Sequence, residues 1–283
     1  MKRKLASFWT GAPLGPIEQI SALSFLSVGH ELTVYSTGPV EGLPLGVELR
    51  DANEILSTQH IVTHRKTGSA ALYSDLFRYA LLNQTDYTWV DLDMVALRPL
   101  PDNMDYLVGF ESAEEVNGAV LRLPAGSSTL ALLSKFKVDT HGYPPFLTGF
   151  RYFRYVVKSL GRGLHISDWP WGSIGPRALT YYLQQTGEIT HALPKEAFYP
   201  VSYRQVERFA KPYDLTMDSF GEQTYAVHLW GKALRQHIKE KCGGAIPENS
   251  FLACSIKHYS EAMEFDICSG QRKIIDRGIC YQS

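Results

Sequence analysis

The chain has few cysteines, no surplus of charge of one sign and no long hydrophobic run. Its 283 residues include 4 cysteines, and 28 basic residues nearly balance 29 acidic ones, which gives a formal net charge of −1. Non-specific binding to nucleic acid needs a basic face, so we do not expect a nucleic-acid partner. The 45% of hydrophobic residues is instead the share of an ordinary globular protein with a sizeable core.

No stretch reaches the roughly 18 to 20 apolar residues that cross a membrane. The opening residues, MKRKLASFWTG, are basic but lack the apolar run of about 7 to 15 residues that a signal peptide has. We therefore expect a cytoplasmic protein without a transmembrane span. The basic run Lys2-Arg3-Lys4 allows weak peripheral contact with an anionic membrane, although a solubilising role is the simpler explanation.

The cysteines cluster near the C-terminal end of the sequence. No two of them have zinc-knuckle spacing, so free thiols or two disulfides remain as alternatives. The positions are Cys242, Cys254, Cys268 and Cys280. Their clustering predicts two parts, a main domain at residues 1–240 and a cysteine-containing tail at residues 241–283 whose role is unknown.

The first half of the chain has the pattern of an α/β protein. KLASFWTG reads as a strand, GPIEQISALSFLSVGH as a helix with matching Pro and Gly punctuation, and HELTVYS as a second strand, which predicts a parallel sheet. TGSAALYSDLFRYALLNQT predicts a helix that is apolar over so much of its surface that it must be buried. Strands are expected at YTWVDLD, DYLVGFE and NGAVLRLP.

The second half is less regular. Helices are predicted at GSSTLALLSKFKV, at RYFRYVVKSLG and in the segment that begins near Pro176. The segment AFYPVSYRQ is expected to be extended. TYAVHLWGKALRQHIKEKC predicts a strand followed by a helix. The aromatic, Gly- and Pro-rich segment HISDWPWGSIGP between them is expected to be an irregular loop.

Asp91 and Asp93 follow the apolar residues YTWV. Side chains two residues apart on a strand share a face, and ligands of parallel sheets bind where strands end. Adjacent carboxylates repel each other unless a cation such as Mg²⁺ or Mn²⁺ joins them. The pair therefore suits a metal site, but a nucleophile with its acid/base partner and two turn-capping residues are alternatives.

Four other groups of residues are candidates for the same site. Ser74, Asp75 and Arg78 share one helix face, either as a surface ion pair or as sugar-binding groups close to the aspartates. His228 ends a late strand and is either a structural histidine or a third metal ligand. Trp9-Thr10-Gly11 ends the first strand and is either a core Trp with a turn Gly or a site that holds a nucleobase. The aromatic loop holds Trp169 and Trp171, which are either packing residues or a stacking platform for a sugar ring.

The segments SFWTG, LYSDLFRYALL, YTWVDLDMVALRPL, NGAVLRLP, GSIGPRALT and AVHLW occur in this order. Together they resemble the DXD-containing GT-A glycosyltransferases of the α-1,4-galactosyltransferase group over about residues 4–235. The resemblance implies an α/β fold of GT-A (Rossmann-like) type, with a mixed sheet flanked by helices, an irregular acceptor-side region and a small C-terminal tail. It also implies a UDP-sugar donor, an Mn²⁺ or Mg²⁺ ion and retention of anomeric configuration.

The implied function is transfer of a hexose or N-acetylhexosamine to a glycan, glycolipid or other hydroxyl acceptor, as in polysaccharide or glycolipid biosynthesis. The implied metal ligands are Asp91, Asp93 and His228. The implied donor-binding residues are Trp9, Thr10, Gly11, Tyr73, Ser74, Asp75, Arg78, Asp91 and Leu92. Asp168, Trp169, Trp171 and Gly175 are expected on the acceptor side. No nucleophile is identified.

Two other functions compete with this one. A haloacid-dehalogenase-type phosphatase would use Asp91 as nucleophile and Asp93 as acid/base. That fold normally carries the motif on its first strand and needs a late acidic motif, which this sequence lacks. An inactive sugar-nucleotide-binding module would differ from the enzyme by lacking turnover.

Overall fold

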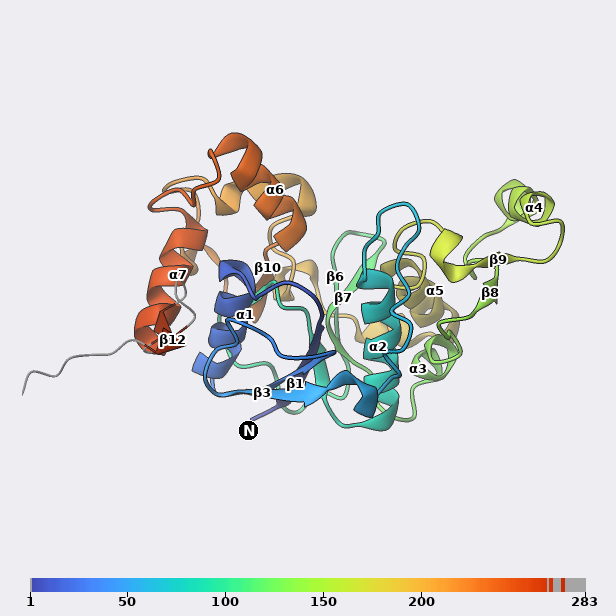
Figure 1. Ribbon diagram of the computed structural model, residues 1–283, viewed down its shortest axis with the longest axis horizontal. Coiled ribbons are helices and arrows are strands. Elements are labelled where there is room, and N and C mark those ends of the chain that lie inside the picture. The colour runs from blue at the N-terminus through green and yellow to red at the C-terminus, as the bar shows by residue number, and fades with distance from the viewer. Residues whose placement is uncertain (1, 264, 267–270, 273–283) are drawn as a thin grey trace, which may run out of the picture.

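The structure is a computed structural model that describes residues 2–263, 265–266 and 271–272. Its centre is a mixed sheet of six strands in the order β3-β2-β1-β4-β7-β6 (Figure 1). The first four strands are mutually parallel, and β7 pairs antiparallel with both β4 and β6. The strands are β1 (Lys4–Trp9), β2 (Glu31–Ser36), β3 (Val47–Asp51), β4 (Thr88–Val90), β6 (Leu107–Phe110) and β7 (Val116–Arg122). The predicted GT-A-like fold class is confirmed.

Helices cover both faces of this sheet because strand side chains alternate. Leu5 packs in the core beneath α1, whereas its neighbour Ala6 packs in the core beneath α2. Figure 1 shows α1 and α7 on one side of the sheet and α2, α3 and α5 on the other. The helices are α1 (Pro16–Ser27), α2 (Ala71–Gln84), α3 (Ser128–Leu133), α4 (Gly149–Lys158), α5 (Pro176–Thr186), α6 (Gly231–Lys241) and α7 (Phe251–Ala262).

Short paired strands and single turns of 3₁₀ helix complete the described elements. β5 (Met94–Ala96) pairs antiparallel with β10 (Ala226–His228), next to the two aspartates. β8 (His141–Gly142) pairs with β9 (Leu164–His165), and β11 (Phe265–Asp266) pairs with β12 (Gln271–Arg272). The 3₁₀ turns are η1 (Ala52–Glu54), η2 (Ile166–Asp168), η3 (Glu188–His191), η4 (Lys195–Ala197), η5 (Tyr203–Phe209) and η6 (Met217–Ser219).

Most predicted elements are present, one prediction is wrong, and several described elements were not predicted, among them β3, β5, β8, β9 and α7. The segment AFYPVSYRQ, predicted to be extended, has η4 at its start and η5 at its end, so that prediction is wrong. Its aromatic residues Phe198 and Tyr199 are fully buried, and their packing overrides the local preference for an extended chain. Strand β3 is an edge strand that was not predicted. Its sequence VELRD is charged and half-exposed, so it lacks the alternation of apolar and polar residues that identifies a strand.

The tail contributes to the core through α7. Phe251 and Leu252 are buried, and the Tyr259 hydroxyl donates to the Ala96 carbonyl at 2.8 Å. Cys242 and Cys254 are free thiols, whereas Cys268 and Cys280 lie outside the described residues. The boundary at residue 240 stays a prediction.

Two features bear on membrane contact. Within the described ranges, no helix is long and apolar enough to span a membrane. Arg3 is only 8% exposed, and its guanidinium donates to the carbonyls of Pro101 and Met104. The basic run at residues 2–4 therefore does not present all three of its charges to a surface.

Candidate active site

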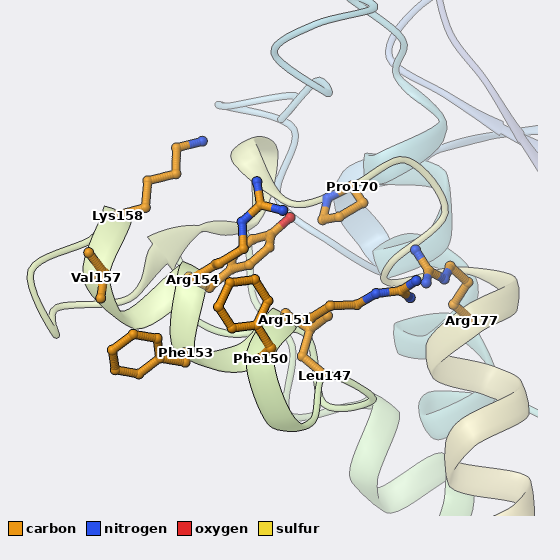
Figure 2. A pocket seen from close by; sticks show the side chains of 10 residues that line it. Leu147, Phe150, Arg151, Phe153, Arg154, Val157, Lys158, Pro170 and Arg177 are labelled. Carbon is orange, nitrogen blue, oxygen red and sulfur yellow. The ribbon is translucent and has the colours of Figure 1, made fainter.

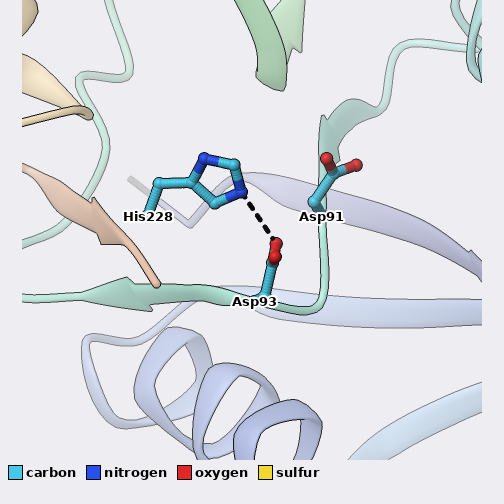
Figure 3. Close-up of side chains that lie close together, drawn as sticks. All are labelled: Asp91, Asp93 and His228. Atoms are coloured by element: carbon cyan, nitrogen blue, oxygen red, sulfur yellow. Dashed lines mark hydrogen bonds and ion pairs between the residues drawn. The ribbon is translucent and has the colours of Figure 1, made fainter. Parts of the chain in front are cut away.

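The two aspartates lie in the turn that joins β4 to β5. β4 ends at Val90 and β5 begins at Met94, so Asp91 and Asp93 both fall between the strands. The pairing of β5 with β10 places His228 opposite Met94. Ligand atoms of Asp91, Asp93 and His228 all lie within 4.8 Å of one another (Figure 3). The structure thus brings together residues that are 135 positions apart in the sequence.

Asp93 is held by two groups from the C-terminal part of the chain. Its Oδ1 lies 3.1 Å from His228 Nε2, and its Oδ2 accepts a 2.8 Å hydrogen bond from the backbone N–H of Gly231, the first residue of α6. Burial alone would raise the pKa of Asp93, but the nearby His228 and the Gly231 N–H outweigh it and lower that pKa. Burial disfavours the imidazolium, yet the Asp93 carboxylate raises the pKa of His228.

Asp91 is held from the opposite side by Arg78 and Trp89. Its Oδ1 accepts from Trp89 Nε1 at 2.7 Å and from Arg78 Nη2 at 3.1 Å. Arg78 also donates to the Gly118 carbonyl at 2.6 Å and stacks over the Trp89 ring at 4.8 Å. Burial raises the pKa of Asp91, and the Arg78 charge only partly offsets this effect. The two carboxylates therefore differ in their tendency to ionise.

Asp75 lies one helical turn before Arg78, at 3.5 Å from its guanidinium. Burial raises the pKa of Asp75 to about 6. Gly175, which precedes α5, lies so close that a Cβ atom there would be 2.6 Å from an Asp75 carboxylate oxygen. The predicted sugar-binding aspartate is therefore enclosed by α2 and the start of α5.

A cavity of about 510 Å³ opens beside these residues. Its lining includes five predicted site residues, namely Asp75, Arg78, Asp91, Trp171 and His228. It also includes residues that the sequence did not single out, namely Glu111, Glu115, Asn117, Arg177, Tyr203 and Trp230. A volume of this size suits a sugar and part of an acceptor.

A second cavity of about 190 Å³ lies on the other side of the aspartates. Four predicted site residues line this cavity alone, namely Trp9, Ser74, Leu92 and Asp93. Arg78 and Asp91 line both cavities, so the acidic pair lies between them. Glu18 and Arg235, which were not predicted, line the smaller cavity and form an ion pair at 2.5 Å.

Some predicted site residues make contacts elsewhere. The buried Tyr73 hydroxyl donates to the carbonyls of Leu56 and Ser57, and Trp169 is buried with its indole N–H on the Leu164 carbonyl. Asp168 pairs with Arg65 at 2.9 Å, and the Thr10 hydroxyl lies 3.1 Å from that of Thr37. Gly11 turns the chain after β1 with φ +97°. None of these five predicted residues belongs to the described lining of either cavity.

Comparisons with known proteins point to one family. A model described as the alpha 1,4-glycosyltransferase conserved region matches residues 165–248, which include His228, Trp230 and Gly231. In this region the chain is similar to the α-1,4-glycosyltransferases. A human alpha-1,4-N-acetylglucosaminyltransferase is 26% identical over 170 residues, which cover 56% of this chain and 42% of that protein. The chain thus spans less than half the length of this relative, and the predicted resemblance is confirmed.

The site residues missed by sequence analysis come from two sources. Asn117 lies in the quoted segment NGAVLRLP, Trp230 ends the quoted segment AVHLW and Gly231 follows it directly, so these segments already marked their positions. Glu18 and Arg235 lie on helices that are far apart in the sequence, and only the packing of α6 near α1 brings their side chains together. No local pattern could have identified that pair.

Proposed function

We propose that the protein is a metal-dependent, retaining glycosyltransferase. It would move a hexose or N-acetylhexosamine from a UDP-sugar to a hydroxyl acceptor of glycan or glycolipid type. The observation that carries the proposal is the cluster of Asp91, Asp93 and His228 between two cavities. The smaller cavity, with Trp9 at its edge, suits the nucleotide, and the larger cavity suits the sugar and the acceptor.

The three clustered side chains fit an Mn²⁺ or Mg²⁺ ion. Two carboxylates and one imidazole are ligands that Mn²⁺ accepts, whereas Mg²⁺ would rely more on the carboxylates and on substrate oxygens. The aspartates lie close enough to repel each other, and a cation would remove that repulsion. When bound, the ion supplies Lewis-acid stabilisation of the departing diphosphate. A relative that acts on N-acetylglucosamine supports an N-acetylhexosamine as one donor candidate.

The surrounding side chains orient these ligands and the donor. Arg78 and Trp89 fix the Asp91 carboxylate through hydrogen bonds to the same oxygen, and the Gly231 N–H fixes Asp93. Asp75 accepts hydrogen bonds from hydroxyls of the donor sugar in the larger cavity. Arg235 places a positive charge in the smaller cavity, where it stabilises negative charge on the diphosphate.

The phosphatase alternative fits the topology less well. The aspartates follow β4, the fourth strand in chain order, rather than the first strand. Asp91 accepts hydrogen bonds from Trp89 and Arg78 on one oxygen, which lowers its nucleophilicity. In the proposed transferase, Asp91 does not act as a nucleophile, so these contacts are compatible with its role.

Thermal unfolding with a panel of nucleoside-diphosphate sugars, with and without Mn²⁺, tests the proposal. We expect a UDP-sugar to raise the melting temperature only when Mn²⁺ is present, because a ligand of the native state shifts the unfolding equilibrium. Asp93→Asn should abolish this shift. The matched control is Asp86→Asn, which changes an exposed aspartate before β4 and should leave the shift intact.

Turnover separates the alternatives. Slow release of UDP from the preferred donor, and faster release with an added acceptor, supports a transferase. Binding without any UDP release identifies an inactive module, and hydrolysis of a phosphomonoester without a response to nucleotides overturns the proposal. NMR of the product reports the anomeric configuration, and inversion would contradict the retaining mechanism.

A further inference from the structure

Helix α4 projects from the body of the protein at the end of a two-stranded base. β8 and β9 pair on either side of residues 143–163, and Figure 1 shows α4 at the edge of the molecule, far from the central sheet. None of the ten residues of α4 is buried. A helix of a globular protein normally buries its apolar stripe, so this one lacks a partner among the described residues.

The exposed surface of α4 carries two parallel ridges of side chains. Phe150, Phe153 and Val157 form an apolar ridge with 75%, 60% and 56% of their surfaces exposed. Arg151, Arg154 and Lys158 form a basic ridge one residue further on, with the same spacing of three and then four residues. Figure 2 shows Phe153 and Lys158 pointing to opposite sides of the helix.

The charged side chains of the segment that carries α4 have only one sign. Residues 140–167 contain no aspartate or glutamate, although the whole chain has a net charge of −1. Arg162 follows shortly after the helix and adds to its basic residues. The segment therefore attracts anionic surfaces.

We propose that α4 is an interfacial helix that docks the protein on an anionic lipid membrane. A helix that lies in the membrane interface has aromatic and aliphatic residues on one side and Lys or Arg on the other, as α4 has. The apolar ridge enters the boundary between headgroups and acyl chains, while the basic ridge contacts lipid phosphates. A second copy of the chain is a poorer occupant, because a symmetric contact would bring two basic ridges together.

The docked helix lies next to the larger cavity. Between α4 and the body is an open groove of about 720 Å³, lined in part by Leu147, Phe150 and Arg151 of the α4 region (Figure 2). Pro170 and Arg177 line both this groove and the larger cavity. A membrane bound by α4 would therefore lie close to the side of the protein on which Trp171 lines the larger cavity.

Co-sedimentation with lipid vesicles tests the proposal. The experiment contains neither donor nor metal ion, so its outcome does not depend on the proposed catalytic function. The full chain should bind vesicles of phosphatidylcholine with about 30% phosphatidylserine, bind pure phosphatidylcholine at least tenfold more weakly, and dissociate as NaCl is raised. Equal binding to both vesicle types, or no binding to either, overturns the proposal.

Variants assign the binding to α4. Arg154→Gln with Lys158→Gln should lower partitioning by about 30-fold, because each basic residue near an anionic surface contributes about fivefold. Phe150→Ser with Phe153→Ser should lower it at least tenfold. Both double variants should keep the melting temperature of the unaltered protein, because no residue of α4 is buried.

Matched controls exclude general effects of charge and hydrophobicity. Lys135→Gln with Lys137→Gln changes two exposed lysines outside α4, and Leu45→Ser changes a leucine that is 70% exposed. Both should bind vesicles as the unaltered chain does. If the controls lose binding equally, or if the phenylalanine variant instead converts a dimer to a monomer in light scattering, the proposal is wrong.

Discussion

The carboxylate of Asp93 accepts a 2.8 Å hydrogen bond from the backbone N–H of Gly231, a residue 138 positions later in the sequence. Gly231 begins α6, so the partial positive charge of that helix end also favours the carboxylate. A turn after β4 and the start of α6 therefore build one side of the candidate metal site together. A side chain at position 231 would press on Asp93.

Gly231→Ala tests this dependence. A Cβ atom there would lie 3.1 Å from the Asp93 Cβ and 3.2 Å from Oδ2, so the aspartate must shift by a few tenths of an ångström. We expect Mn²⁺ affinity, measured by calorimetry, to fall about tenfold, as for other groups that orient metal ligands. The melting temperature should change little, because alanine is the better helix former.

Gly126→Ala is the matched control for Gly231→Ala. A Cβ atom at Gly126 would meet nothing within 4 Å, so this variant should bind Mn²⁺ with unchanged affinity. Unchanged affinity in both variants would show that the position of Asp93 does not depend on its approach to Gly231.

Arg78→Lys tests how the other aspartate is held. The guanidinium bonds the Gly118 carbonyl and Asp91 through different nitrogens, a geometry that a single ammonium group cannot reproduce. Because Arg78 is only 7% exposed, we expect a loss of about 1–3 kcal/mol in the free energy of unfolding, measured by urea titration.

Arg65→Lys provides the comparison for Arg78→Lys. Arg65 also pairs with an aspartate, Asp168, but its own side chain is 68% exposed. Such exposed pairs contribute little, so we expect its stability to change by less than about 0.5 kcal/mol. Equal effects of the two substitutions would contradict a special role for Arg78.

The sequence predicts the first half of the fold well, including the position of the two aspartates after a strand. β1, α1, β2, α2 and β4 lie within segments that the sequence predicts as strands and helices, and the aspartates follow the strand expected at YTWVDLD. The proximity of His228 is harder to predict, since it follows from the antiparallel pairing of β5 with β10, two strands of three residues. Strands this short have no periodicity of their own.

Aromatic residues show the limit of prediction most clearly. Trp171 lines the larger cavity whereas its near neighbour Trp169 is buried in the core, although both occur in the same loop sequence SDWPWG. The sequence alone predicts the same role for both tryptophans. The difference arises from the 3₁₀ turn at residues 166–168, which directs Trp169 inward so that its indole N–H meets the Leu164 carbonyl.

Arg235→Gln tests the proposed contribution of the second cavity. Arg235 and Glu18 form an ion pair in which Glu18 is buried and Arg235 is half-exposed toward the cavity. If Arg235 stabilises charge on the diphosphate, its replacement should lower kcat/KM for the donor about 10- to 100-fold.

Glu18→Gln separates that role from a structural one. This variant keeps the arginine and removes only its buried partner, whose pKa is already raised by burial. We expect kcat/KM to stay within about threefold of the unaltered value, because the cation remains in the cavity. A loss as large as that of Arg235→Gln would instead indicate that the ion pair acts by holding α6 against α1.

His30 should make the stability of the protein depend on pH. Its ring is 4% exposed, and the Leu100 N–H donates to its Nε2 at 2.8 Å, a bond that a protonated ring cannot accept. Burial, together with the charge of Arg3, lowers the pKa of His30 to about 4. The unfolded chain, with an ordinary histidine pKa near 6.5, therefore binds a proton that the native state does not.

The sign follows from this difference in pKa. The stabilisation due to neutral His30 is present above about pH 6.5 and is lost as the pH falls toward 4, by about 1–2 kcal/mol between pH 7 and pH 5. Urea titrations at pH 7, 6 and 5 measure this loss. His30→Gln should remove this loss, so the free energy of unfolding of the unaltered protein should fall relative to that of the variant between pH 7 and pH 5. His60→Gln, at an exposed position, should keep the pH dependence of the unaltered protein. A pH dependence identical to that of the unaltered protein in His30→Gln would contradict the prediction, because glutamine carries no proton to exchange in this range.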